Sequence, residues 1–377
     1  MKIAIVRGKY LNPFEMQYYE PLVKKHDLTG FSSLKPLGEK FAFPVVKLPS
    51  PMDLPDFPYK MPVLNRLFID AQYLFGLEKK LKGFEIAHSA ETYMHFTQQC
   101  LEAKRRGWVK KVVATVSENI PFNNEGIRGR KRFKKRAILE LDQLIAISQK
   151  AKEALLLEGC PEKKINVIGH HINTDRFKPK PIFKKDFKNI KILFVGRLEQ
   201  EKGVEEIIMA ARKLAQDRDL QRYRLEYLLV GSGKERNNLL KFVERLGIKN
   251  RFFWRESAYL QMPSFYQQAD ILLAPSRPTR YWQEQFGMVL LEAMASRLPI
   301  ITTNSGAIPE TVGSAAILVP PADFLALADA IKKLVLQPKL RLEMGIKARQ
   351  RAVKLFDYQL GAQKLAQVYE KVSHYHC

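Results

Sequence analysis

The chain has 377 residues, of which 46% are hydrophobic and 27% charged, and its 63 basic against 39 acidic residues give a net charge of +24. This length and composition exclude a disordered chain and allow two domains, each with a full core. No uninterrupted apolar stretch approaches the roughly 20 residues of a membrane-spanning helix. The N-terminal run Met1–Arg7 predicts a first buried strand rather than a signal peptide.

The three cysteines, Cys100, Cys160 and Cys377, are scattered and show no CxxC spacing. They predict a reducing compartment, without a disulfide framework or a zinc site. The pair His170-His171 has no further ligands at suitable spacing, so we expect no bound metal. We expect a cytoplasmic protein.

The first half of the chain alternates β-rich runs with helical patterns. Strands are predicted at 2–6, 85–88, 111–116 and 143–148, and helices at 62–81 and 92–104. The stretch 35–62 is rich in proline and irregular.

The densest basic run lies at 128–136 and precedes an apolar pattern, which predicts the exposed start of a helix. Its seven basic residues are Arg128, Arg130, Lys131, Arg132, Lys134, Lys135 and Arg136. Three interpretations stay open: a solvated face, nucleic-acid binding, or a patch on an anionic membrane surface, where each cation contributes roughly 1 kcal/mol. No zinc-finger, RNP, homeodomain or KH pattern accompanies the run, so we expect no specific nucleic acid.

The second half alternates strands and helices regularly. Strands are predicted at 190–195, 223–230, 251–254, 271–275 and 299–303, and helices at 203–214, before Leu246, at 262–268 and at 358–372. This order predicts a parallel sheet with helices on both faces, and ligands then bind at the carboxyl ends of the strands. A segment rich in proline and lysine separates the halves. We expect domains at 1–175 and 189–356, a linker at 176–188 and a final helix within 357–377.

Glu284 and Glu292 bracket a Phe-Gly run at which a helix should begin. The free N–H groups and the dipole of a helix start form an anion site. Eight helical residues would separate the two carboxylates by roughly 12 Å. A sugar joined through a diphosphate to a nucleoside has that length and charge pattern, although an amphipathic helix with two solvated glutamates also explains it.

Two cations, Arg197 and Lys202, follow Gly196 at a predicted turn from strand to helix. Such a pair suits a diphosphate leaving group, but a solvated surface gives the same pattern. Gly231 ends the next strand, where it brings the backbone close to a ligand or forms a tight turn.

Several segments in order resemble the retaining GT-B glycosyltransferases of family 4. They are Ala146-Ile-Ser148, Val167-Ile-Gly169, Ile172–Pro179, Leu193–Gly203, Leu229–Gly233, Asp270–Ser276, Glu284–Glu292 and Gly306–Glu310. The resemblance covers roughly residues 140–330. It implies an α/β GT-B fold: two Rossmann-like parallel-sheet domains facing across a cleft, with the C-terminal helix crossing back to the first domain.

The resemblance also implies roles for single residues. Arg197 and Lys202 would neutralise the donor diphosphate, Glu284 would contact the transferred sugar, and Glu292 would bond the ribose hydroxyls. Further donor-binding positions are Gly196, Gly231, Arg255, Phe286, Gly287, Met288 and Val289. Arg255 stands near the expected contact with the base. On the acceptor side we expect Glu118, Asn119, His88 and Glu91, although strand-end capping explains Glu118 and Asn119 equally well.

The function implied is transfer of a hexose-type sugar from a nucleotide diphosphate-sugar to a hydroxyl of a carbohydrate or lipid-linked acceptor, with retention (EC 2.4). Cations and N–H dipoles placed at the diphosphate would lower the barrier without a metal, so no cofactor is expected. With a lipid-linked acceptor, the protein would rest on the inner face of the membrane. Two other classes stay open: a nucleotide-sugar epimerase or phosphorylase on the same fold, and a non-catalytic polyanion-binding protein.

Overall fold

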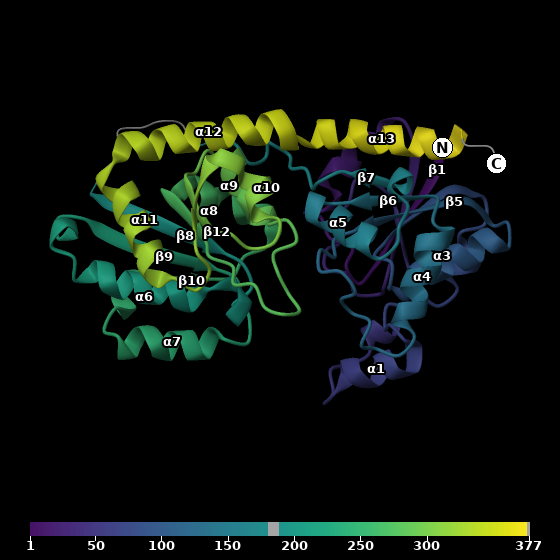
Figure 1. Cartoon of the computed structure of the whole chain (residues 1–377), viewed down its shortest axis with the longest axis horizontal. Coiled ribbons are helices and arrows are strands. Elements are labelled where there is room, and N and C mark those ends of the chain that lie inside the picture. Colours follow the sequence, from purple (N-terminus) through teal and green to yellow (C-terminus); the bar gives the residue numbers. More distant parts are fainter. Residues whose placement is uncertain (180–187, 375–377) are drawn as a thin grey trace. The chain divides into compact units, whose positions relative to one another are not determined.

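The computed structural model describes residues 1–179 and 188–374, which form two compact units (Figure 1). The first unit comprises Met1–His171 and Tyr358–Cys377, and the second comprises Ile172–Asp357. Most of the linker predicted at 176–188 lies outside the described residues, since 180–187 are not among them.

The first unit is built on a parallel sheet of seven strands in the order β3-β2-β1-β4-β5-β6-β7. The strands are β1 Lys2–Gly8, β2 Asp27–Ser32, β3 Val45–Lys47, β4 Phe84–Ala90, β5 Val109–Val116, β6 Gln143–Ala146 and β7 Ile165–Val167. The four strands predicted in this half are confirmed. Most residues of β1, β4 and β5 are buried, as expected for central parallel strands covered on both faces.

Helices cover this sheet, and the last helix of the chain belongs to them. They are α1 Lys60–Phe68, α2 Leu77–Lys80, α3 His95–Arg105, α4 Arg130–Glu140, α5 Gln149–Leu157 and α13 Tyr358–His374, with 3-10 turns η1 Met16–Lys24, η2 Pro51–Asp53 and η3 Glu162–Lys164. The single helix predicted at 62–81 is wrong. It divides into α1 and α2 because Ile69 adopts a left-handed backbone (φ +64°) that ends α1.

The second unit has a parallel sheet of six strands in the order β10-β9-β8-β11-β12-β13. The strands are β8 Asn189–Val195, β9 Arg224–Val230, β10 Phe252–Arg255, β11 Ile271–Ala274, β12 Ile300–Thr303 and β13 Ala316–Val319. All of its predicted strands are confirmed, and β13 is an addition.

Helices pack on both faces of this second sheet. They are α6 Val204–Ala215, α7 Arg236–Arg245, α8 Met262–Gln268, α9 Met288–Ala295, α10 Ile308–Val312, α11 Phe324–Leu336 and α12 Pro338–Phe356, with 3-10 turns η4 Gln200–Lys202, η5 Arg218–Leu220, η6 Lys249–Arg251, η7 Tyr259–Gln261 and η8 Gly313–Ala315. Within the described ranges, no helix has both the length and the hydropathy to span a bilayer.

Candidate active site

The loop between β11 and α9 places Glu284 beside a cation and a hydroxyl. Lys202 Nζ lies 2.8 Å from Glu284 Oε2, and Ser276 Oγ donates to the same oxygen at 2.9 Å. The Lys202 ammonium also lies 4.5 Å from the centre of the Trp282 ring, within the range of a cation–π interaction. The structure therefore brings together Lys202 and Glu284, which are 82 residues apart in the sequence.

Two glycines allow the loops around Glu284 to pack closely against one another. A Cβ on Gly203 would lie 2.0 Å from the Pro275 carbonyl oxygen, and one on Gly306 would lie 2.0 Å from the Glu284 carbonyl oxygen. Both glycines have positive φ, which L side chains rarely adopt. Because Gly306 fits there, Ala307 N–H can donate to the Glu284 carbonyl at 2.9 Å. The Glu284 backbone is thus fixed by the loop after β12.

Helix α9 begins at Met288 with Gly287 as its N-cap (φ +88°), as the sequence predicted. Glu284 lies before the helix, so the 12 Å separation estimated for a continuous helix does not apply. The Phe286 side chain is buried and packs edge-on against Phe356. Its carbonyl accepts from Thr311 Oγ1 at 2.9 Å. Leu290 N–H donates to the Gly287 carbonyl at 2.9 Å, whereas the N–H groups that precede it at a helix start have no carbonyl one turn earlier to pair with.

Glu292 is buried in α9, where Tyr266 Oη donates to its Oε2 at 2.5 Å. Tyr259 also hydrogen-bonds to this carboxyl. Burial raises the pKa of Glu292 to about 7, and the two hydrogen bonds partly oppose that rise. Glu292 is therefore poised to exchange a proton near neutral pH.

The remaining donor-side residues lie on neighbouring strand ends. A Cβ on Gly231 would lie 1.9 Å from the Gly196 carbonyl oxygen, so the close approach at Gly231 is between two strand-end loops. The Arg197 side chain is exposed and pairs with Glu201 at 3.0 Å rather than with Glu284. Arg255 is exposed and donates to the Trp254 carbonyl at 2.8 Å. Met288 and Val289 are half-buried.

Sequence reasoning missed Ser276, Trp282 and Tyr266 as contacts of the two glutamates. Ser276 ends the segment Asp270–Ser276, whose resemblance to the family implies no role for the serine. Trp282 stands two residues before Glu284, and an aromatic residue so near was a usable signal. Tyr266 lies 26 residues from Glu292, and nothing local in the sequence connects them.

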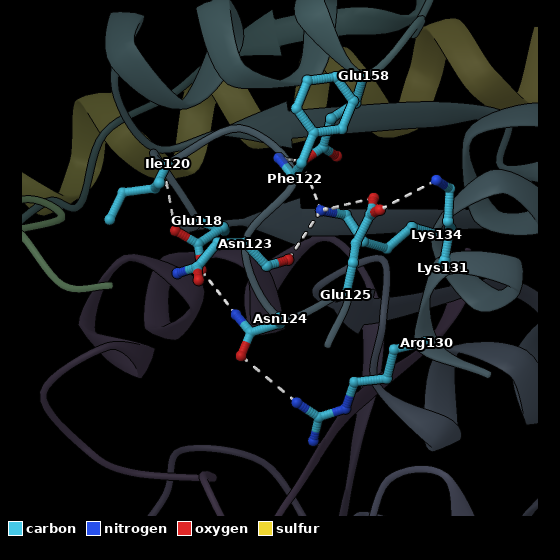
Figure 2. Close-up of polar contacts among 10 residues, drawn as sticks. All are labelled: Glu118, Ile120, Phe122, Asn123, Asn124, Glu125, Arg130, Lys131, Lys134 and Glu158. Atoms are coloured by element: carbon cyan, nitrogen blue, oxygen red, sulfur yellow. Dashed lines mark hydrogen bonds and ion pairs between the residues drawn. The ribbon is translucent and has the colours of Figure 1, made fainter. Parts of the chain in front are cut away.

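In the first unit, Glu118 follows β5 and accepts four hydrogen bonds within its own loop. Its Oε1 accepts from the backbone N–H group of Asn119. The same oxygen accepts from the backbone N–H group of Ile120, and Oε2 accepts from the side-chain amides of Asn123 and Asn124 (Figure 2). Glu118 and Asn119 are both buried. The Glu118 carboxylate therefore organises the loop 118–124. This agrees with the alternative interpretation, in which Glu118 and Asn119 cap the end of the strand.

Glu91 follows β4 with a left-handed backbone (φ +57°) and a buried side chain. Its Oε1 accepts from the Ser117 N–H at 2.8 Å. Its Oε2 is buried and has no hydrogen-bond partner in the described part of the chain. Burial raises the pKa of Glu91 to about 7, and the nearby Glu118 adds to the rise. Among the acceptor-side predictions, Glu91 alone combines burial with an unsatisfied carboxyl oxygen in this part of the chain.

His88 was predicted on the acceptor side, and its position in the structure contradicts this. The ring is fully buried within β4. Nδ1 lies 2.6 Å from Tyr369 Oη of α13, and Nε2 lies 2.8 Å from Thr115 Oγ1. Desolvation lowers the pKa of His88 well below its ordinary value, so it is a neutral core histidine that joins α13 to the sheet.

The predicted place of Arg130 and Lys134 in an exposed basic patch is also wrong, because both side chains are buried in ion pairs. Arg130 Nη2 lies 2.7 Å from Asp70 Oδ2. Lys134 Nζ lies 2.5 Å from Glu158 Oε1 and donates to the Asn123 carbonyl (Figure 2). Arg136 is half-buried and pairs with Glu140. The exposed cations of the run are Arg128, Lys131, Arg132 and Lys135.

No group of three His, Cys, Asp or Glu side chains in residues 1–179 and 188–374 is placed to hold a metal ion.

Several solved structures share the architecture of this chain. HepE of Anabaena, solved in complex with UDP and glucose, has a TM-score of 0.78 at 18% identity, covering 98% of this chain and 100% of that chain. A glycosyltransferase from Rickettsia africae ESF-5 has a TM-score of 0.75 at 19% identity, covering 100% and 99%. These likenesses confirm the predicted α/β GT-B fold.

Sequence comparison covers most of the chain. The family described as glycosyltransferase family 4 matches residues 26–176, and that described as glycosyl transferases group 1 matches residues 175–351. D-inositol 3-phosphate glycosyltransferase of Corynebacterium jeikeium (strain K411) is 30% identical over 260 residues, which are 64% of this chain and 60% of that relative. The match thus spans less than two thirds of that relative's length. The chain belongs to the family 4 type of GT-B glycosyltransferases.

Proposed function

We propose that this chain is a retaining glycosyltransferase (EC 2.4) that moves a hexose-type sugar from a nucleotide diphosphate-sugar to a hydroxyl of a carbohydrate or lipid-linked acceptor. The contact between Lys202 and Glu284 beside the start of α9 carries the proposal. A cation, a carboxylate and a helix N-terminus lie together there, which suits a sugar attached to a diphosphate. The complex of HepE with UDP and glucose supports a donor of this class.

The chemistry follows from where charge develops. The bond between the anomeric carbon and the phosphate oxygen breaks, so negative charge grows on the diphosphate. Arg197, Lys202 and the N–H groups at 287–289 would stabilise that charge, and the proposed mechanism requires no metal ion. The acceptor oxygen bonds to the anomeric carbon on the same face, and its proton passes to the departing phosphate oxygen. Glu284 would hold the sugar in position.

The other predicted residues keep supporting roles in the proposal. Glu292 would accept from the ribose hydroxyls, sharing its carboxyl with Tyr266. Glu91, Glu118 and Asn119 would lie on the acceptor side, and Glu91 Oε2 supplies a buried oxygen for an acceptor hydroxyl. With a lipid-linked acceptor, the proposal places the protein in the cytoplasm, at the inner membrane face.

The first test is a thermal-shift screen with UDP-, GDP-, ADP- and TDP-sugars. A ligand present at about 100 times its Kd should add about 2.7 kcal/mol of stability. Product analysis then distinguishes a glycoside from the free epimerised nucleotide-sugar or sugar phosphate of the alternative enzymes. No shift with any donor, together with salt-sensitive nucleic-acid binding, would contradict the proposal in favour of a polyanion-binding protein.

A further inference from the structure

Helix α1 carries apolar side chains on both its inner and its outer face. On the inner face, Leu64 packs in a small cluster with Met52 and Ala71. On the outer face, Val63 is 43% exposed and Leu67 is 71% exposed. The exposed Arg66 lies between these two residues in the sequence, so the outer face of α1 is partly apolar and partly basic. Such a face suits an occupant that is itself both apolar and charged.

Exposed apolar side chains continue along the loop that leads into α1. Together with the two outer residues of the helix they form what we call the apolar face: Leu54, Phe57, Tyr59, Met61, Val63 and Leu67. Single exposed apolar residues are ordinary on a protein surface, whereas a cluster marks an interaction site. These six fall within 14 consecutive residues, so they lie close together along the chain.

The apolar face is held in shape by a buried lysine and by unusual backbone. Lys60 Nζ donates to the carbonyls of Leu54 and Met52, the latter at 3.3 Å, and pairs with Asp56 at 3.2 Å. Tyr59 and Ile69, which flank α1, both have left-handed backbone (φ +60° and +64°). Such conformations are costly for residues other than glycine and concentrate at functional sites.

Exposed cations lie next to this face, because the end of α1 meets the start of α4. A Cβ on Gly129 would lie 2.8 Å from Ile69 Cδ1, and Arg130 pairs with Asp70. Figure 1 shows α1 and α4 in the part of the first unit away from α13. The exposed cations are Arg66, Arg128, Lys131, Arg132 and Lys135. The nearby acidic residues Asp56 and Glu125 are both in ion pairs, with Lys60 and with Lys131 and Lys134.

We propose that the apolar face and these five cations form one surface that binds the interface of an anionic lipid bilayer. The apolar side chains would enter the boundary between headgroups and acyl chains, and the cations would meet the phosphates. A second copy of the chain would set cations against cations, and a nucleic acid would leave the apolar face in water. The inference is independent of the proposed transfer, since none of these residues is placed in the donor or acceptor site.

Co-flotation of the full chain tests the proposal, using vesicles of phosphatidylcholine alone or mixed equally with phosphatidylglycerol. We expect binding to the anionic vesicles only. The triple variant Lys131→Gln, Lys135→Gln and Arg132→Gln should lower the partition coefficient by about 100-fold. The double variant Val63→Ser and Leu67→Ser should lower it by about tenfold or more. All five side chains are exposed, so thermal unfolding should be unchanged.

Helix α12 offers matched controls. Leu342 and Ile346 are an exposed apolar pair at the same spacing, and Lys339, Lys347 and Lys354 are exposed cations. Their Ser and Gln variants should float as well as the parent protein. Equal loss in these controls, no preference for anionic vesicles, or a dimer that Leu67→Ser dissociates would each overturn the proposal. Donor-induced thermal shifts need no vesicles, so failure here leaves the transferase proposal separately testable.

Discussion

Two glutamates in loops that follow parallel strands, Glu284 in the second unit and Glu118 in the first, are held in opposite ways. Glu284 contacts an ammonium and a hydroxyl from other elements and remains partly accessible. Glu118 accepts four N–H bonds from residues within six positions and is buried. The partners of Glu284 come from other elements of the second unit, whereas those of Glu118 belong to its own loop. We therefore expect Glu284 to act in the proposed transfer and Glu118 to stabilise its loop.

The largest effect on stability is expected from the buried ion pairs of the first unit. Lys134→Met leaves Glu158 buried without its cation, and we expect a loss of about 3–5 kcal/mol in unfolding free energy. Chemical denaturation measures this loss. Lys135→Met, at the exposed neighbouring position, is the matched control and should change stability by no more than about 0.5 kcal/mol. Equal effects of the two variants would show that Lys134 is not a structural cation.

Substitutions in the proposed donor site should change the rate of transfer rather than the stability. Glu284→Gln keeps the size of the side chain and removes its charge, and we expect transfer to fall by about 100- to 1000-fold with little change in stability. Lys202→Ala should lose activity to a similar degree. Lys234→Ala is the control, because Lys234 is an exposed cation paired with Glu199 on a neighbouring loop. Steady-state transfer rates check these outcomes, and near-normal turnover in Glu284→Gln would refute the site assignment.

Glu91 offers a prediction about pH. Burial raises its pKa from 4.5 to about 7, so between these values the unfolded chain loses a proton that the folded protein keeps. The stability from protonated Glu91 is complete below about pH 4.5, falls as the pH rises to about 7, and is constant above.

Glu91→Gln keeps a neutral side chain at every pH. It should match the parent protein below about pH 4.5 and exceed its stability by up to about 3 kcal/mol at about pH 8. Denaturation curves across this range measure the difference. Glu292 also has a pKa of about 7. Because Glu292 is present in both proteins, its contribution to the pH dependence cancels in the difference between their stabilities. A stability difference that does not vary with pH would show that Glu91 has an ordinary pKa.

How far the sequence predicted these features depends on the range of the interactions. Five strands of the second unit and the start of α9 follow from local patterns, and the glycines 203 and 306 permit the loop contacts there. The strands β2, β3, β7 and β13 were missed because they are short or lack an alternating pattern. The burial of His88 depends on Tyr369, 281 residues away, and that of Arg130 on Asp70, 60 residues away. Local patterns carry no record of such partners.

Substitution of Ser276 has the smallest expected effect on activity. It also tests the difference between the surroundings of Glu284 and Glu118. Its hydroxyl donates to Glu284 at 2.9 Å, and one such bond to a partly exposed carboxylate contributes about 1 kcal/mol. Ser276→Ala should therefore lower kcat about fivefold with little change in KM. Ser264→Ala, which removes an exposed hydroxyl that donates to a backbone carbonyl, is the control.

If Ser276 only filled space, the variant would change stability and leave kcat intact. A fall in kcat that Ser276→Thr restores would instead show that Ser276 positions the Glu284 carboxylate, because threonine also carries a hydroxyl on Cβ. The same logic separates the two units. Removing a single neutral donor should slow the reaction at Glu284, whereas Glu118, with four donors, should tolerate the loss of one amide with a change in stability alone.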